Sequence, residues 1–126
     1  HFYFADFWRA DSGMLAALHV LAALGQDTAG QSLSELLSPY SNYVSSGEVN
    51  STVLEAAAAT EVVRAHYALQ PGITMDDLDG LTVASPDWWF NLRSSNTEPL
   101  LRLNVEAGSA EQMQSVRDDV LTMIRS

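Results

Sequence analysis

The segment from Trp88 to Glu106 limits the possible folds of this chain more than any other, because it predicts two paired strands around a polar loop. Large apolar side chains recur there at every second position: Trp88, Phe90 and Leu92, and then Leu101, Leu103 and Val105. A period of two is typical of strands that bury one face and leave the other open. We therefore expect a hairpin with one face in the core and one available face.

The available face of this hairpin carries Arg93 and Arg102 beside a loop of Ser, Ser, Asn and Thr at 94–97. Hydroxyls, an amide and backbone N–H groups can donate hydrogen bonds to one anion, and phosphate offers several acceptor oxygens. An arginine adds a planar fork that binds two phosphate oxygens. An ordinary solvated turn can carry the same residues. The loop is, however, long for a hairpin and lacks glycine, which favours an anion site.

Charge and composition exclude several classes of function. The 126 residues are about one domain in length, and 16 acidic against 6 basic residues give a net charge of −10. That charge argues against nucleic acids and anionic membranes as partners. The absence of cysteine excludes disulfides, thiolate metal ligands and cysteine nucleophiles. No apolar run approaches the length of a membrane span, so we expect a cytoplasmic protein.

The first part of the chain predicts a strand followed by helices. The aromatic residues of segment 1–9 indicate a strand cut from a larger sheet, and therefore a chain that is a fragment. Asp11 or Ser12 can cap a helix over residues 14–24. The pattern from Ser32 to Glu35 is a capping box that opens a short helix, which Pro39 closes. We place the main boundary near residues 38–40.

The rest of the chain predicts a small α+β unit. A strand over 43–49 precedes a capping box at 52–55 and an alanine-rich helix that stops at 70–72. Segment 74–80 holds three aspartates, but it lacks the glutamate that closes a calcium loop, so we expect a turn or a helix start. A strand at 81–84, the hairpin, and a helix capped at 109–112 follow. The order indicates an antiparallel sheet of about four strands with two helices on one face.

The central segment also resembles a known family. Residues 93–99, Arg-Ser-Ser-Asn-Thr-Glu-Pro, with Arg102 and Glu106, are similar to the phosphate-binding loop of the α-D-phosphohexomutases. Residues 47–51 and 79–83 look like the C-terminal domain of enzymes in the phosphomannomutase/phosphoglucomutase branch. Asn96 stands where the phosphoglucosamine mutase branch typically carries Gly. His1 resembles the last residue of the family's Glu-x-Ser-x-His sugar-binding motif.

The resemblance implies domains and site residues. Residues 1–37 would be the strand–helix tail of the third, sugar-binding α/β domain, and residues 38–126 the C-terminal phosphate-binding domain. It implies the following roles: phosphate ligands Arg93, Ser95, Asn96 and Thr97; supporting residues Glu98 and Arg102; a catalytic residue His1; and no metal ligand in this chain. Glu98 would orient one of the arginines or hold the loop.

The resemblance also implies a reaction. Enzymes of this branch interconvert hexose 6-phosphate and hexose 1-phosphate through a bisphosphorylated intermediate, with glucose or mannose 1,6-bisphosphate as activator. A phosphoserine and Mg²⁺ in other domains carry the phosphoryl transfer. This chain would bind the phosphate that is not reacting, would have the remaining domains of the same enzyme as partners, and would be inactive alone.

Two other functions are consistent with the residues. One is a stand-alone sugar-phosphate-binding or regulatory module without catalysis, which would use the same loop. The other is an interaction domain in which the tandem Trp88 and Trp89 contact a partner protein. A tandem tryptophan more often supplies one core ring and one partly exposed ring.

Overall fold

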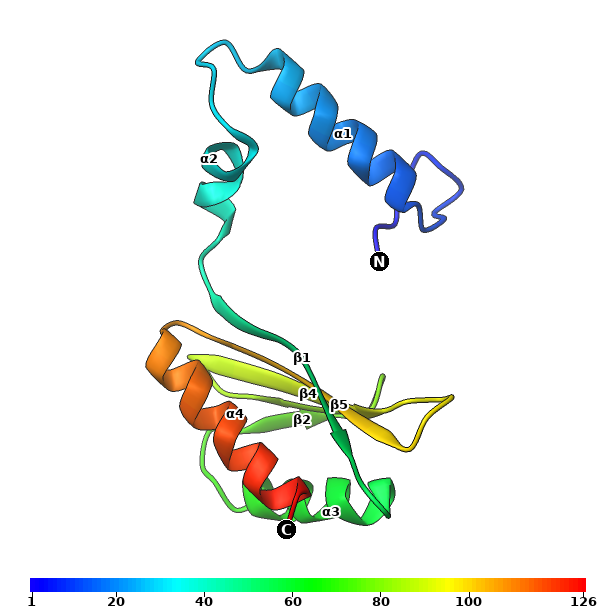
Figure 1. The fold of residues 1–126 in the computed structure, drawn as a ribbon, viewed down its shortest axis with the longest axis vertical. Helices are drawn as coiled ribbons and strands as arrows, with labels where there is room; N and C mark the ends of the chain where they lie inside the picture. Colours follow the sequence, from blue (N-terminus) through cyan, green and yellow to red (C-terminus); the bar gives the residue numbers. More distant parts are fainter. The chain divides into compact units, whose positions relative to one another are not determined.

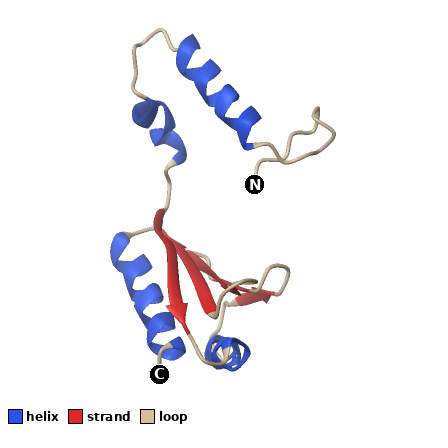
Figure 2. Ribbon diagram, turned by 45° about the vertical axis from the view of Figure 1, so that its right-hand side comes forward, coloured by secondary structure: helices blue, strands red, loops and turns tan.

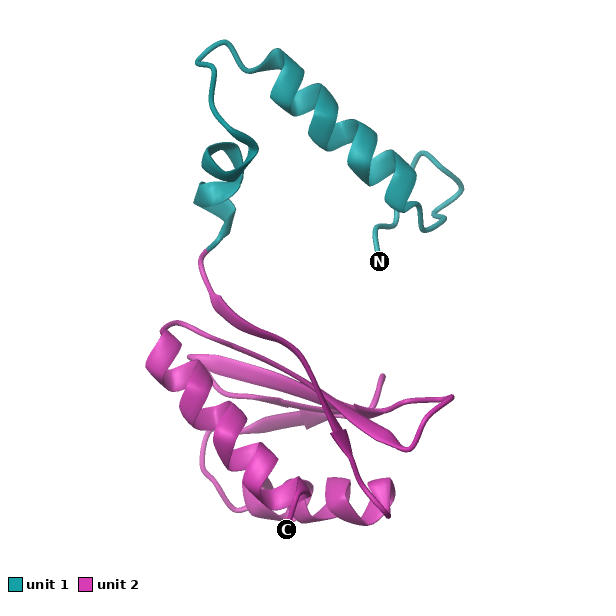
Figure 3. Ribbon diagram, viewed as in Figure 1, with its two compact units in different colours: residues 1–41 teal, residues 42–126 magenta.

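The computed structural model describes residues 1–126, which form two compact units, residues 1–41 and residues 42–126 (Figure 3). Unit 1 contains helices α1 (Gly13–Gln26) and α2 (Leu33–Leu37) and the 3-10 turn η1 (Ser38–Tyr40) (Figure 1). Two predicted helix starts are confirmed. The Ser12 hydroxyl accepts a hydrogen bond from the Leu15 backbone N–H at 3.2 Å, and Ser32 and Glu35 form the reciprocal capping box. None of the helices combines the length and the hydropathy that a membrane span requires.

The strand predicted for residues 1–9 is wrong. This segment consists mainly of turns, with one isolated bridge between Tyr3 and Asp11. Trp8 and Arg9 have positive φ angles of 50° and 54°, which a strand does not contain. A strand is stable when it pairs over several residues with neighbours that share a buried face. Unit 1 offers this segment no such neighbour, so the aromatic pattern does not produce a strand there.

Unit 2 is one antiparallel sheet with two helices. Its elements are β1 (Val44–Thr52), α3 (Ala56–Ala68), β2 (Thr74–Asp76), β3 (Leu81–Ala84), β4 (Trp88–Ser94), β5 (Leu100–Ala107) and α4 (Ala110–Ile124). The strand order is β1-β5-β4-β3-β2, and every neighbouring pair is antiparallel. Both helices lie on the same face of the sheet (Figure 2). The predicted α+β class is therefore confirmed, with a fifth, short strand.

Two local predictions in this unit are wrong in whole or in part. Residues 74–76 form edge strand β2, paired with residues 82–84 of β3, so the turn that we expected over 74–80 is confined to residues 78–79. The capping box expected at 52–55 does not form either, because Thr52 pairs with Leu100 in the sheet and α3 begins after Glu55, whose side chain makes no cap. In both places pairing with a distant strand overrides the local pattern.

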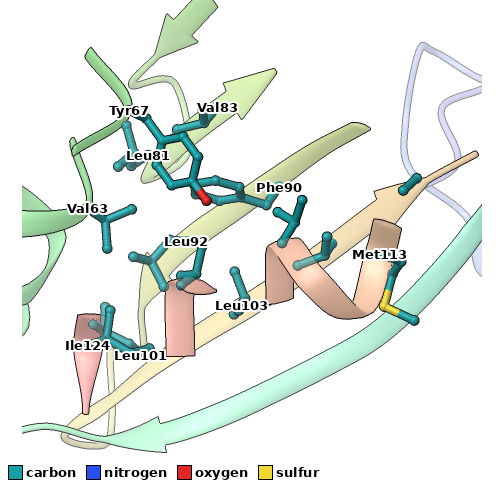
Figure 4. Close-up of a cluster of buried hydrophobic side chains, with 14 residues drawn as sticks. Val63, Tyr67, Leu81, Val83, Phe90, Leu92, Leu101, Leu103, Met113 and Ile124 are labelled. Carbon is teal, nitrogen blue, oxygen red and sulfur yellow. The ribbon is translucent and has the colours of Figure 1, made fainter. Parts of the chain in front are cut away.

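The core of unit 2 lies between the sheet and the two helices (Figure 4). The buried hydrophobic residues are these: Val63, Tyr67, Leu81, Val83, Phe90, Leu92, Leu101, Leu103, Val105, Ala107, Met113, Val116, Val120 and Ile124. The alternation predicted for the hairpin is thus confirmed. The tandem tryptophans divide between the two faces, since Trp88 stacks on Phe90 inside and Trp89 is partly exposed on the open face.

Because of Tyr67, the stability of this core depends on pH in the alkaline range. Burial, with a smaller contribution from the Asp119 charge, raises the pKa of the Tyr67 phenol to about 12. Its folded pKa therefore exceeds the value near 10 of an unfolded tyrosine. The contribution of neutral Tyr67 is fully present below about pH 10 and is lost as the pH rises toward 12, at up to about 1.4 kcal/mol per pH unit.

We expect the free energy of unfolding to fall in this pH window and the fall to be smaller in Tyr67→Phe. Urea denaturation at a series of pH values measures it. Tyr40→Phe, at an exposed tyrosine of unit 1, is the matched control. An equal pH dependence in Tyr67→Phe and wild type would contradict the assignment.

Candidate functional site

The loop of the central hairpin has a defined backbone, although it lacks glycine. It spans residues 95–99 and forms the yellow tip that joins β4 and β5 (Figure 1). The Ser95 N–H donates to the Leu100 carbonyl at 2.8 Å, and the Leu100 N–H donates to the Glu98 carbonyl at 2.8 Å. The Val53 N–H donates to the Pro99 carbonyl at 3.4 Å and ties the loop to the segment after β1. These bonds fix both ends of the loop.

Ser95 connects the loop to the sheet. Its hydroxyl oxygen accepts hydrogen bonds from the Thr97 N–H at 3.4 Å and from the Arg102 guanidinium at 3.3 Å. Asn96, Thr97 and Glu98 are exposed. Their side chains are therefore accessible to an anion, while the half-buried Ser95 is already held in place.

The two arginines lie directly opposite each other at the base of the loop. Arg93 on β4 is the register partner of Arg102 on β5, and both point to the open face of the sheet, away from the helices. Glu48 on β1 reaches both of them: one carboxylate oxygen is 3.6 Å from Arg93 Nη2 and the other is 3.7 Å from Arg102 Nη1. The Nε of Arg102 is buried and has no hydrogen-bond partner.

The charges at this site differ in sign from those of the whole chain. At the base of the loop, two guanidinium groups and the Glu48 carboxylate leave one positive charge in excess, on a chain with a net charge of −10. Opposite charges attract across a distance of a few ångströms despite a repulsive general field, because salt screens the distant charges more strongly. The arrangement can therefore bind an anion locally.

The structure brings the predicted residues Arg93, Ser95 and Arg102 together at one end of the hairpin. Glu98 contributes only its backbone carbonyl to the loop and pairs with neither arginine. That pairing belongs to Glu48, which sequence reasoning missed as a site residue. The signal available was its place in segment 47–51, one of the segments that look like the phosphomannomutase/phosphoglucomutase branch.

His1 belongs to a separate group of residues in unit 1. Its Nδ1 lies 2.5 Å from a carboxylate oxygen of Asp11, and the other oxygen accepts the Phe2 N–H at 2.7 Å. A carboxylate that holds one ring nitrogen fixes the orientation of an imidazole and leaves the second nitrogen free for other contacts. Asp11, read from the sequence as a turn residue or a helix cap, thus orients His1.

The aspartates of segment 74–80 are engaged in other contacts. Asp77 pairs with Arg64 of α3, and Asp76 accepts the Leu78 N–H at 3.0 Å. No group of three or more histidine, aspartate or glutamate side chains in the chain is arranged to hold a metal ion.

Comparisons with known proteins agree on one family. A model described as phosphoglucomutase/phosphomannomutase, C-terminal domain, matches residues 48–123, and one described as phosphoglucomutase/phosphomannomutase, alpha/beta/alpha domain III, matches residues 1–43. A phosphomannomutase of Salmonella montevideo is 43% identical over 100% of this chain and 27% of its own length. A phosphomannomutase of Methanocaldococcus jannaschii is 37% identical over 98% of this chain and 26% of its own length.

A solved structure gives the same result. The crystal structure of a phosphoglucomutase/phosphomannomutase family protein from Burkholderia thailandensis matches with a TM-score of 0.70 and 27% identity, over 98% of this chain and 26% of that one. The chain thus spans about a quarter of the length of the proteins it matches. By sequence and by fold, it belongs to the phosphoglucomutase/phosphomannomutase family, of which it represents the C-terminal part.

Proposed function

We propose that the loop 95–99 and Arg93 bind the phosphate group of a hexose phosphate that is not reacting, as part of a phosphohexomutase. The observation that carries the proposal is the pair of facing arginines at the base of a loop of hydroxyl and amide donors. Arginine binds two phosphate oxygens at once, and such charge-assisted bonds are stronger than neutral ones. Ser95, Asn96 and Thr97 supply further donors.

Recognition of the substrate through its phosphate group suits an isomerase that must bind its substrate in two orientations. A hexose 1-phosphate and a hexose 6-phosphate present the same dianionic group at opposite ends of the sugar. A site that recognises this group, and not the hydroxyls, can hold either end and place the other near the reacting centre. Phosphoryl transfer depends on such positioning and on charge stabilisation.

Within the whole enzyme, residues 1–37 would complete the third domain and residues 38–126 would form the C-terminal domain. His1, oriented by Asp11, would act at the sugar. Mg²⁺ and the reactive phosphoserine would belong to other domains, as the family resemblance implies. The branch would act on mannose or glucose phosphates, with the 1,6-bisphosphate as activator, and a cytoplasmic location stays a prediction.

Replacing Arg93 with alanine tests the phosphate site. We expect the dissociation constant for glucose 6-phosphate to rise roughly tenfold to a hundredfold, because a charge-assisted pair contributes about 1.5–3 kcal/mol. The amide signals of Ser95 and Thr97, followed by NMR during a titration of the 126-residue chain, report the binding.

The matched control is Arg117→Ala, which removes the same charge from α4, where Arg117 pairs with Asp118. It should leave the dissociation constant nearly unchanged. If Arg93→Ala and Arg117→Ala had equal effects, binding would depend on the general charge of the chain and the proposed site would be wrong.

A further inference from the structure

Glu48 reaches the open face of the sheet because β1 contains a bulge. Residues Ser45 and Glu48 are paired with Glu106 and Asn104, so β1 has one residue more than β5 over this stretch. Without that extra residue, Glu48 would stand opposite Leu103 and point toward the core. A shift of one residue exchanges the two faces of a strand, so the bulge is what brings this carboxylate to the arginines.

Specific contacts hold the bulge. Gly47 has a φ of +63°, a conformation that L side chains rarely adopt. The Ser46 hydroxyl accepts the Val105 N–H at 2.9 Å and replaces the ladder contact that the bulge removes. The positive φ of Gly47 and the hydrogen bond to Ser46 thus determine the conformation of the segment Ser-Ser-Gly. That conformation determines the position of Glu48.

The arginines need a counter-charge in this position. Like charges directly opposite each other on one face of a sheet repel and destabilise the pair. Arg102 also donates to Ser95, but Glu48 is the one side chain that pairs with Arg93. At 3.6 and 3.7 Å the carboxylate is close enough for ion pairs but too far for hydrogen bonds. The guanidinium donors of Arg93 therefore stay available for another acceptor.

We propose that Glu48 is a positioning residue for the phosphate site: it holds Arg93 beside Arg102 without using the hydrogen bonds that Arg93 needs for phosphate. The inference rests on the proposed function of Arg93. Its physical basis is pre-organisation, because an arginine that is already placed loses less conformational freedom when the anion binds. The negative charge of Glu48 also repels a phosphate, and we propose that the positioning of Arg93 outweighs this repulsion.

The test is a double-mutant cycle on the 126-residue chain with inorganic phosphate as the probe. We expect Glu48→Gln to raise the dissociation constant roughly threefold to fivefold, the range of a partly exposed ion pair. In the Arg93→Ala background the same substitution should no longer weaken binding, because Glu48 positions Arg93; the loss of its repulsion should instead tighten binding slightly. The Nε–H signal of Arg93 in NMR spectra should also show faster exchange in Glu48→Gln.

Two further variants serve as controls for the cycle. Glu48→Asp keeps the charge and should bind phosphate more tightly than Glu48→Gln. Glu61→Gln removes a carboxylate that pairs with Arg64 on α3 and should leave phosphate binding unchanged. Thermal unfolding of each variant shows that the fold is intact.

The outcomes separate this inference from the proposed function. Weaker binding in Arg93→Ala but not in Glu48→Gln would overturn the role of Glu48 alone. Tighter binding in Glu48→Gln would do the same, since it would make Glu48 a competitor of the phosphate. An equal effect of Glu48→Gln with and without Arg93 would reduce its role to general electrostatics. No effect of Arg93→Ala would overturn both proposals.

Discussion

Replacing Gly80 with alanine is expected to lower the free energy of unfolding of unit 2 by about 2–5 kcal/mol. Gly80 has a φ of +76°, and a Cβ atom there would lie 2.6 Å from the Leu92 carbonyl oxygen and 2.7 Å from the Cβ of Arg93. The backbone cannot yield cheaply, so the strain of the left-handed conformation adds to a steric clash. The clash falls on the strand that carries Arg93, so phosphate binding should weaken as well.

Two other glycines separate these causes. Gly72 has a φ of +79° with open space around it, so Gly72→Ala measures the conformational strain alone, about 1–2 kcal/mol. Gly108 has neither a positive φ nor a close neighbour, so Gly108→Ala should have little effect. Urea denaturation followed by circular dichroism compares the three variants. Equal losses at Gly72 and Gly80 would show that the close approach to β4 is absent.

Replacing Phe90 with alanine should have an even larger effect, a loss of about 3–5 kcal/mol. Phe90 is fully buried in the middle of the sheet. Its ring lies 5.1 Å from the ring of Tyr67 and 6.0 Å from that of Trp88, measured between centroids. Its removal would leave a cavity between β4 and α3 and would also remove two aromatic contacts.

The neighbouring residue supplies the control. Trp89 lies on the same strand but points to the open face, where its indole N–H donates a hydrogen bond to Glu106 at 3.1 Å. Trp89→Ala should therefore cost much less than Phe90→Ala, despite the larger side chain. If Phe90→Ala unfolds the chain completely, Phe90→Leu, which leaves a smaller cavity, gives a measurable midpoint in urea. Similar losses at positions 89 and 90 would contradict the assignment of the two faces.

The parts of the fold that were predictable from the sequence are those set by neighbouring residues. The alternation in the hairpin and the caps at Ser12 and Ser32 depend on side chains within a few positions of one another. Strand β2 and the start of α3 depend on pairing with distant strands. Thr52 is the clearest case, because its local pattern predicts a helix start, whereas its pairing with Leu100 keeps it in β1.

The residues of the candidate site also differ in whether they could be predicted from the sequence. Arg93 and Ser95 were identifiable because they belong to one continuous segment whose residue types fit an anion. The contact of Glu48 with Arg93 was not predictable, although segment 47–51 resembles the family, because it requires both the strand order β1-β5-β4 and a bulge that changes the face of the strand. Neither is encoded by spacing within one segment. The same holds for Asp11, whose contact with His1 follows from how the turn segment closes.

The interior place of β5 in the sheet, between β1 and β4, has a consequence for the motions of the site. Both edges of β5 are hydrogen-bonded, to β1 on one side and to β4 on the other, and its buried residues lie in the middle of the core. The backbone of Arg102 can therefore separate from that of Arg93 or Asn50 only if β5 loses a neighbouring strand. Amide hydrogens of the ladder should exchange through global unfolding, whereas loop 95–99 can open locally. The tip can thus adapt to a ligand above strands whose backbone spacing stays constant.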